Sequence, residues 1–362
     1  PGIDIYNCKL SNFLRSNKDK IYTDLDVFFS FNKNYCITIT GTNGKSTTCQ
    51  LLYEVLRNQK FDVRLVGNIG KPILSERKIK EKTIFVIEAS SYQLEYSKIF
   101  KSKYAVIINI SPDHIERHKT LNNYIKAKLK LIESQSKGDL AFVKKKDKLI
   151  DKGLNSIKFN SKLVKIDTKI NNSFLKKIKN NYFLNEANKE NLLFVYEISK
   201  KLNLDKKLFL NTVEKFKGLN YRQQIIYNKN KLTIINDSKS TSFSSSIGIL
   251  KMSSNIYWLV GGVPKKGDTF NLPKRYHKKI KAFIYGKNTL FFNKQLKDKV
   301  KVENFKSLSA ALRRIFRILK QEKSIHETIL FSPCAASFDS FRNFEDRGLF
   351  FNKLVKNYLN EG

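Results

Sequence analysis

The chain has 362 residues, 41% of them hydrophobic, and a formal net charge of +37. This length is enough for two medium-sized domains with buried cores. The longest apolar stretches, such as Ala105–Ile110, are strand-sized and much shorter than the roughly 18 residues of a membrane span. We therefore expect an α/β protein without a membrane-spanning helix.

The positive charge is dominated by Lys, as in Lys144-Lys145-Lys146, and is spread along the whole chain. Such runs are more typical of solvated surfaces than of binding stripes. Arg, which is favoured for contacts with bases and phosphates, is scarce. We expect no specific nucleic-acid partner, although a basic nucleic-acid-binding or phosphate-binding module remains an alternative that salt-dependent DNA binding without ligation would favour.

Cysteine usage and the first residues predict the compartment. None of the four cysteines belongs to a Cys-x-x-Cys motif, which predicts reduced thiols, no zinc site and a cytoplasmic location. The chain begins Pro1-Gly2-Ile3, with neither an initiator Met nor a signal pattern. We expect the natural N-terminus to be missing, and we expect a monomer.

The first half alternates predicted strands and helices. Tyr35–Thr40, Thr83–Ile87 and Tyr104–Ile110 are apolar on both faces, and Ser46–Arg57 is helix-like. Strands that are apolar on both faces are typical of a parallel sheet covered by helices on both sides. The pattern predicts a doubly wound, mostly parallel α/β domain.

A second alternating pattern begins near Gly218–Asn220 and predicts a smaller Rossmann-like α/β domain. Its predicted elements are the strands Lys231–Asn236, Ile256–Val260, Ala282–Tyr285 and Thr328–Phe331 and the helix Ser307–Lys320. Residues 139–185 are rich in Lys and Asn, and the sequence does not place them. We expect a remnant of an N-terminal domain with a linker over 1–32, a central domain over 33–219 and a C-terminal domain over 220–362.

The strongest single signal is a phosphate-binding loop between a predicted strand and a predicted helix. It consists of Gly41, Thr42, Asn43, Gly44, Lys45, Ser46 and Thr47. Glycines let backbone N–H groups approach phosphate oxygens, and the helix N-terminus adds positive charge. Lys45 is expected to reach the β- and γ-phosphates and Ser46 to ligate Mg²⁺. The loop predicts ATP binding, although Ile39 stands where the general pattern has its first glycine.

Polar residues follow two further predicted strands. Glu88 comes at the end of one strand, and Asp113-His114 follows another. Because ligands bind beyond the carboxyl ends of parallel strands, we expect Glu88, His114 and a hydroxyl to meet beside the phosphates and to ligate Mg²⁺. Taken singly, Glu88 would be a helix-capping partner and His114 a loop residue.

An ordered series of motifs resembles the Mur ligase family, and within it the D-glutamate-adding branch. The phosphate loop is common to Mur ligases and folylpolyglutamate synthetases, whereas Ser90–Glu95, Asn236–Lys239 and Ser332–Phe341 are similar to the D-glutamate-adding branch. These segments argue against the alternative of a ligase with another substrate. The other motifs of the series are Gly67–Gly70, Asn109–His118, Lys126–Leu129, Asn188–Asn191, Gly218–Arg222 and Gly261–Asp268.

The resemblance implies a ligase of peptidoglycan precursor synthesis. It would join UDP-N-acetylmuramoyl-L-alanine to D-glutamate in the cytoplasm, with ATP and two Mg²⁺ ions. It also implies an N-terminal UDP-binding domain, most of which would be absent here. The chain departs from the family pattern at Ala187, Asn220-Tyr221 and Val263-Pro264.

The resemblance assigns roles to individual residues. Catalysis falls to Lys45, His114 and Lys128, and Mg²⁺ binding to Ser46, Glu88, His114 and Lys128. Nucleotide contacts beyond the loop fall to Asn191, Arg222, Asp237 and Lys239. Substrate contacts fall to Asn68, Ser90, Gln93, Thr241, Lys265, Ser337, Phe338 and Phe344. For Phe341 we prefer a role in the core.

Lys128 carries the most specific implication. In isolation, a Lys within Lys126–Lys130 would be a solvated helix residue. The resemblance implies instead that CO₂ carboxylates it to a carbamate that ligates Mg²⁺. Asn68, Ser90 and Gln93 likewise have simpler interpretations as turn or capping residues.

Overall fold

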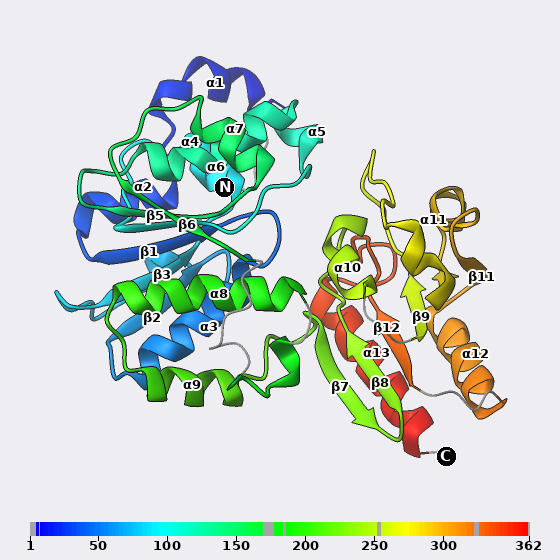
Figure 1. Cartoon of the computed structure of the whole chain (residues 1–362). Coiled ribbons are helices and arrows are strands. Elements are labelled where there is room, and N and C mark those ends of the chain that lie inside the picture. The colour runs from blue at the N-terminus through cyan, green and yellow to red at the C-terminus, as the bar shows by residue number, and fades with distance from the viewer. Residues whose placement is uncertain are drawn as a thin grey trace. The chain divides into compact units, whose positions relative to one another are not determined.

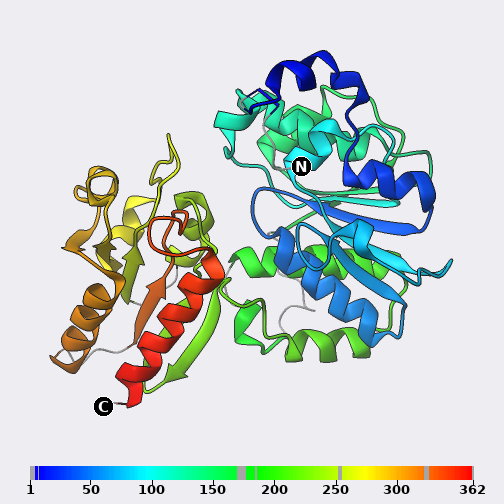
Figure 2. The same cartoon turned by 180° about the vertical axis from the view of Figure 1, so that it is seen from behind.

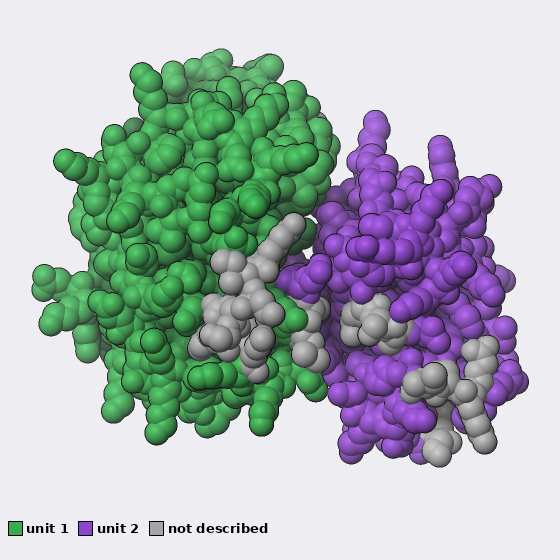
Figure 3. Space-filling model, viewed as in Figure 1, with its two compact units in different colours: residues 1–184, 188–216 green, residues 185–187, 217–362 purple. Residues whose placement is uncertain are grey.

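The structure is a computed structural model of the chain, and it describes residues 5–6, 8–168, 177–183, 186–251, 255–321 and 326–360. The expectation for Pro1-Gly2-Ile3 lies outside these ranges, as do residues 169–176 and 184–185 of the segment that the sequence does not place. Two compact units share the chain, residues 1–184 with 188–216 and residues 185–187 with 217–362 (Figure 3). We call them unit 1 and unit 2.

Unit 1 is built on a six-stranded parallel sheet with the order β2-β3-β1-β4-β5-β6 (Figure 1). Its strands are β1 (Tyr35–Thr40), β2 (Val63–Gly67), β3 (Ile84–Glu88), β4 (Tyr104–Ile107), β5 (Leu140–Lys144) and β6 (Lys162–Ile166). The chain runs from β1 to β2 and β3 on one side and then to β4 on the other. The order therefore reverses at β1, and such a reversal opens a crevice at the carboxyl end of the strand.

Helices cover both faces of this sheet (Figures 1 and 2). Ile37 and Ile39 of β1 pack against α3, α8 and α9 on one face, whereas Phe85 and Ile87 of β3 pack against α2, α4, α6 and α7 on the other. This packing is why both central strands are buried on both faces. The helices are α1 (Ser11–Ser16), η1 (Lys18–Lys20), α2 (Asp24–Phe31), α3 (Lys45–Asn58), η2 (Ile73–Ser75), α4 (Ser91–Tyr96), α5 (Ile115–His118), α6 (Leu121–Glu133), α7 (Lys148–Leu154), η4 (Asn181–Phe183), α8 (Glu186–Lys201) and α9 (Lys206–Lys215).

Unit 2 also has a six-stranded sheet, with the order β11-β10-β9-β12-β8-β7 and one antiparallel edge strand, β7. One face packs against α10 and α11 around Trp258, and the other against α12 and α13 around Phe283. The elements are β7 (Gln224–Lys229), β8 (Leu232–Asn236), α10 (Phe243–Leu250), β9 (Asn255–Val260), η5 (Lys274–Lys279), β10 (Ile280–Tyr285), α11 (Thr289–Leu296), β11 (Lys301–Phe305), α12 (Leu308–Gln321), β12 (Glu327–Phe331) and α13 (Phe344–Asn360).

The α/β fold class is confirmed, with two parallel-rich sheets flanked by helices. Within the described ranges, no helix has both the length and the apolar character that crossing a bilayer requires.

Candidate active site

The phosphate-binding loop lies between β1 and α3, where the order of the unit 1 sheet reverses. The N-cap of α3 is Gly44, whose φ of 84° is in the left-handed region. A Cβ added to Gly44 would lie 2.2 Å from Oδ1 of Asn191, which α8 brings against the loop. Only glycine therefore suits this position sterically and conformationally.

Asn109, just beyond β4, ties the loop to the neighbouring strand. Its backbone oxygen accepts from Thr42 N and its Oδ1 accepts from Asn43 N, both over 3.0 Å. The Thr42 hydroxyl lies 3.0 Å from the Tyr124 hydroxyl and donates to the Ser111 oxygen. The loop is therefore positioned by β4 and α6 as well as by its own strand.

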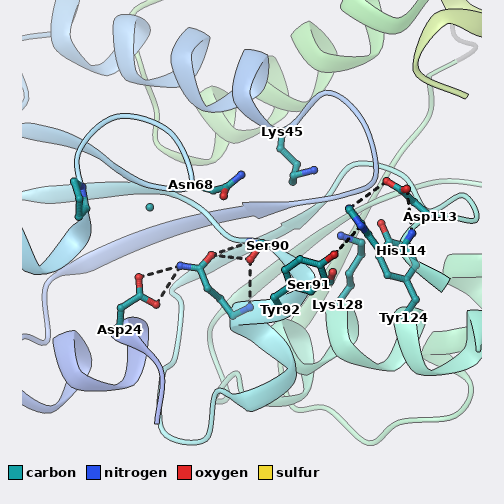
Figure 4. Close-up of a pocket in the computed structure, with 13 residues that line it drawn as sticks. Asp24, Lys45, Asn68, Ser90, Ser91, Tyr92, Asp113, His114, Tyr124 and Lys128 are labelled. Carbon is teal, nitrogen blue, oxygen red and sulfur yellow. Dashed lines mark hydrogen bonds and ion pairs between the residues drawn. The ribbon is translucent and has the colours of Figure 1, made fainter. Parts of the chain in front are cut away.

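A cavity of about 550 Å³ lies next to the loop, at the carboxyl ends of the strands (Figure 4). Six predicted site residues line it, namely Lys45, Asn68, Ser90, Gln93, His114 and Lys128. Several further residues line the cavity without a role predicted from the sequence, namely Asp24, Ser91, Tyr92, Asp113 and Tyr124. The structure thus brings both predicted catalytic lysines and the predicted catalytic histidine to one cavity.

Lys128 is 1% exposed, so its interpretation as a solvated helix residue is wrong. Its Nζ donates to the Gly41 oxygen over 2.8 Å and lies 3.3 Å from Thr40 Oγ1. Burial, and after it the positive charge of Lys45, holds the pKa of Lys128 well below its ordinary value of 10.5. The uncharged amine is therefore far more accessible here than for a lysine in water.

Glu88, the last residue of β3, does not line the cavity but is joined to a residue that does. Its Oε1 accepts from Asn68 Nδ2 over 2.8 Å, and Asn68 N donates to the Glu88 backbone oxygen. Glu88 is 1% exposed, and its Oε2 has no hydrogen-bond partner among the described residues. A buried carboxylate oxygen without a donor is costly unless a cation meets it.

Ser90 and Gln93 form a capping box at the start of α4. Ser90 Oγ accepts from Gln93 N, and Gln93 Oε1 accepts from Ser90 N over 3.0 Å. Gln93 Nε2 donates to both carboxylate oxygens of Asp24, over 3.1 and 3.0 Å. The capping interpretation of these residues is confirmed, and Asp24 holds the Gln93 amide from a second helix, α2.

His114 has a φ of 54°, which is uncommon for a residue with a side chain. Its Nδ1 lies 2.7 Å from the Tyr92 hydroxyl, and its Nε2 lies 3.4 Å from Asp113 Oδ2. His118 is buried one turn further, and burial lowers its pKa to about 4, so it stays neutral. The region around Tyr92 therefore holds two imidazoles in different environments.

In unit 2, three predicted nucleotide contacts gather where β8 ends. Gln223 N, next to Arg222, donates to Asp237 Oδ1 over 3.1 Å, and Lys239 N donates to the Tyr221 oxygen. Ser332 Oγ donates to Asp237 Oδ2 over 2.7 Å. Burial raises the pKa of Asp237 from 3.8 to about 7.

The predicted amino-acid contacts also lie in unit 2. Lys239 Nζ sits 4.1 Å from the centre of the Phe344 ring. Val263 and Ala336 exchange two backbone hydrogen bonds of 2.9 Å, which link the segments that carry Lys265 and Ser337. Ser337 is buried, Lys265, Thr241 and Phe344 are half-buried, and Phe338 is 74% exposed. Phe341 is half-buried, and its ring centre lies 5.5 Å from that of Phe350.

Among the described residues, no three His, Cys, Asp or Glu side chains gather in a way that could hold a metal ion. A metal at this site would therefore depend on mixed ligands, on phosphate oxygens and on a modified lysine. The orphaned Glu88 Oε2 and the Ser46 hydroxyl, in the first turn of α3, are oxygen donors of the kind that Mg²⁺ prefers. The residues present fit such a cation in donor chemistry.

Comparison with known proteins agrees with this geometry. Residues 39–209 match the Mur ligase middle domain. The chain is 34% identical over 356 residues to UDP-N-acetylmuramoylalanine--D-glutamate ligase of Rickettsia prowazekii (strain Madrid E), covering 93% of this chain and 80% of that protein.

Solved structures show the same fold at low identity. MurF from Acinetobacter baumannii superposes with a TM-score of 0.68 at 14% identity, over 92% of this chain and 79% of that one. MurF ligase from Thermotoga maritima in complex with ADP superposes with a TM-score of 0.62 at 15% identity, over 92% and 83%. The domain match and the relative of 34% identity show that the chain belongs to the Mur ligase family, within the UDP-N-acetylmuramoylalanine--D-glutamate ligases.

Proposed function

We propose that the chain joins D-glutamate to UDP-N-acetylmuramoyl-L-alanine at the expense of ATP. The substrate carboxylate attacks the γ-phosphorus, ADP leaves, and an acyl phosphate forms. The amine of D-glutamate then attacks the acyl carbon, phosphate leaves with the bridging oxygen, and the amine loses a proton. The observation that carries the proposal is one cavity beside the phosphate loop, lined by Lys45, His114 and Lys128.

The first step brings two anions together, so fixed positive charge must offset their repulsion. Lys45 stands at the first turn of α3, where the free N–H groups of the helix also point toward the loop. Its Nζ donates to the Gly41 and Thr42 oxygens, both over 3.0 Å. In the proposal, the side chain exchanges these weak local contacts for the β- and γ-phosphates.

Two Mg²⁺ ions would supply the remaining positive charge and polarise the phosphate oxygens. Ser46 and Glu88 would hold one, and His114 with modified Lys128 would hold the other. The support for Glu88 is its buried oxygen without a partner, while Asn68 keeps the other oxygen in place. Asn68, which lines the cavity, thus holds the Glu88 carboxylate through this hydrogen bond.

We assign a carbamate to Lys128. Its uncharged amine attacks CO₂, an N–C bond forms and one proton is released, so the neutral amine becomes an anionic carbamate. The support is that Lys128 is buried and that, among the described residues, its Nζ donates hydrogen bonds to the Gly41 backbone oxygen and the Thr40 hydroxyl rather than to a carboxylate. The negative product also relieves the repulsion between two neighbouring ammonium groups.

The substrates would be divided between the two units. In unit 1, Asn68, Ser90 and Gln93 face the cavity that would take the muramoyl-alanine end. In unit 2, Lys265 and Ser337 would bind the γ-carboxylate of D-glutamate, with Thr241, Phe338 and Phe344 around it. Arg222, Asp237 and Lys239 would contact the nucleotide, as Asn191 would in unit 1.

A cytoplasmic location is part of the proposal. The four cysteines are free rather than disulfide-bonded in the structure, as is usual for proteins of a reducing compartment. The resemblance to the Mur ligases also implies that the two substrates are joined in the cytoplasm.

The test is phosphate release from ATP by the purified chain. Release is expected only when UDP-N-acetylmuramoyl-L-alanine and D-glutamate are both present, and L-glutamate should not replace D-glutamate. Lys45→Ala should abolish release, whereas Lys126→Ala, an exposed lysine of α6, should not. Release that needs another amino acid or a folate would assign a different ligase activity, and release without any acceptor would overturn the proposal.

A further inference from the structure

Tyr92 lines the candidate cavity, yet nothing in the proposed reaction uses its hydroxyl. It is the second residue of α4, between the capping residue Ser90 and Gln93. In Figure 4 its side chain points toward His114, and the two are joined by a hydrogen bond. The distance between the Tyr92 hydroxyl and His114 Nδ1 is 2.7 Å.

The Tyr92 ring is held by its neighbours, independently of that hydrogen bond. It stacks on the buried, neutral His118 at 5.6 Å between ring centres, with 29° between the ring planes. The Arg117 guanidinium lies 5.2 Å from the ring centre on the same helical segment as His118. Packing therefore sets the position of the ring, and the ring sets the position of the hydroxyl.

His114 needs an external partner for its orientation. It caps a four-residue helix, α5, from a left-handed backbone conformation, and its side chain is 33% exposed. An imidazole with one edge open to a cavity turns about its Cβ–Cγ bond unless a ring nitrogen is engaged. Nδ1 lies 2.7 Å from the Tyr92 hydroxyl and 3.7 Å from Glu116 Oε1, so the hydroxyl is its nearer partner, and Nε2 lies 3.4 Å from Asp113 Oδ2.

We propose that Tyr92 is a positioning residue for His114, and that its hydroxyl fixes the ring with Nδ1 against Tyr92 and Nε2 turned toward Asp113 and the ligand of the cavity. The assignment of that ligand as a Mg²⁺ ion rests on the proposed function. Histidines that bind metals almost always engage their other ring nitrogen with an oxygen of the protein, and losing that partner typically costs about 10- to 100-fold in affinity or activity.

The test removes one oxygen atom with Tyr92→Phe, because the phenyl ring keeps the packing on His118 and Arg117. Tyr53→Phe is the matched control, since Tyr53 is a half-buried residue of α3 packed against the hydrophobic core and does not line the cavity. Both variants should unfold at temperatures within a few degrees of the unsubstituted chain. Circular dichroism establishes this before any other comparison.

The first readout is independent of activity and of metal. In ¹⁵N spectra of the metal-free chain, which has four His, the ring nitrogens of His114 are assigned with a His114→Gln variant. Tyr92→Phe should shift the His114 Nδ1 resonance, and Tyr53→Phe should leave it unchanged. Identical His114 resonances in the unsubstituted chain and in Tyr92→Phe would overturn the proposal.

The second readout is ligation. For Tyr92→Phe, kcat should fall about 10- to 100-fold and the Mg²⁺ concentration for half-maximal rate should rise, with the KM for ATP within about twofold. A kcat equal to that of Tyr53→Phe would contradict the positioning role even if the resonance shifts. If the unsubstituted chain shows no ligation at all, the proposed function fails, and the spectra still decide whether Tyr92 orients His114.

Discussion

The side-chain nitrogens of Lys45 and Lys128 donate to the same backbone oxygen, that of Gly41, over 3.0 and 2.8 Å. One lysine comes from the phosphate loop and the other from α6, in the protein interior. Burial, and after it the positive charge of Lys45, holds the pKa of Lys128 well below its ordinary value. A lowered pKa favours the uncharged amine, which is the form that reacts with CO₂.

Carboxylation of Lys128 predicts that activity depends on CO₂ and on a negative charge at this position. Lys128→Ala should lower the rate of phosphate release by at least about 100-fold, and short carboxylates such as acetate should restore part of it, because they supply the missing oxygens. Bicarbonate-free buffer should also slow the unsubstituted chain. The assay is substrate-dependent phosphate release, with Lys126→Ala as the control. Full activity of Lys128→Ala without any addition would refute the carbamate.

Glu88 is expected to matter for its charge rather than for its shape. Glu88→Gln keeps the acceptor for Asn68 but replaces the orphaned Oε2 with an amide nitrogen, which does not ligate a cation. We expect at least a roughly 100-fold lower kcat and weaker Mn²⁺ binding in the presence of a non-hydrolysable ATP analogue. Electron paramagnetic resonance of Mn²⁺ measures the binding. The exposed Glu81→Gln should behave as the unsubstituted chain, and equal Mn²⁺ binding by both variants would remove Glu88 from the metal site.

Gly44 of the phosphate loop has a matched control in Gly138, which lies between α6 and β5. Gly44 and Gly138 both have positive φ, of 84° and 92°, so alanine costs roughly 1–2 kcal/mol of backbone strain at either position. A Cβ at Gly44 also meets Asn191, whereas at Gly138 it meets nothing within 4 Å. Gly44→Ala should therefore lower the free energy of unfolding more than Gly138→Ala and should also weaken ATP binding. Denaturant unfolding and calorimetry measure the two effects, and equal losses in both variants would show that Asn191 does not constrain the loop.

Asp237 predicts a pH dependence of stability for unit 2. Burial favours the neutral carboxyl in the folded chain and raises its pKa from 3.8 to about 7. The neutral group thus contributes stability that is fully present below about pH 4 and is lost as the pH rises to about 7. Asp237→Asn, which does not titrate, should flatten this decline.

The single Trp of the chain reports on this effect. Trp258 is buried in unit 2, and its Nε1 donates to the backbone oxygen of Ser332, the residue whose hydroxyl binds Asp237. Its fluorescence should show a smaller fall in the unfolding midpoint between pH 4 and pH 7 for Asp237→Asn than for the exposed control Asp298→Asn. The same slope in both variants would exclude Asp237 as the cause.

The central elements of both units were predictable because they are buried on both faces. β1 has the predicted bounds, and β3, β4, β8, β9, β10 and β12 lie within a few residues of theirs. The strands that were not predicted from the sequence have fewer consecutive apolar residues or lie toward the edges of the sheets. β2 contains Arg64, and β6 begins and nearly ends with Lys, so neither has the apolar run that identifies a central strand.

The burial of Lys128 could have been predicted from the spacing of apolar residues in α6. Tyr124, Ile125, Lys128, Leu129 and Ile132 follow helical spacing, and all five are buried on the inner face of α6. The alternation of Lys with apolar residues obscured this stripe. A lysine within an apolar stripe at that spacing indicates a buried amine.

Asp24 and Tyr92 belong to the part of the site that local patterns do not determine. Asp24 precedes the phosphate loop by a whole helix and strand and reaches the cavity because Leu25 and Phe28 anchor α2 in the core of unit 1. Tyr92 falls within a motif, but its hydrogen bond to His114 depends on how α4 and α5 meet. Such contacts between distant segments follow from packing, which one sequence does not specify residue by residue.

The central claim is that an acyl phosphate forms on the substrate carboxylate. UDP-N-acetylmuramoyl-L-alanine labelled with ¹⁸O in its carboxylate, incubated with ATP, Mg²⁺ and D-glutamate, tests it most directly by mass spectrometry of the phosphate released. Each released phosphate should carry one ¹⁸O atom from the carboxylate, and the amide product should retain the other ¹⁸O atom. Phosphate that carries no ¹⁸O while the amide product forms would contradict it.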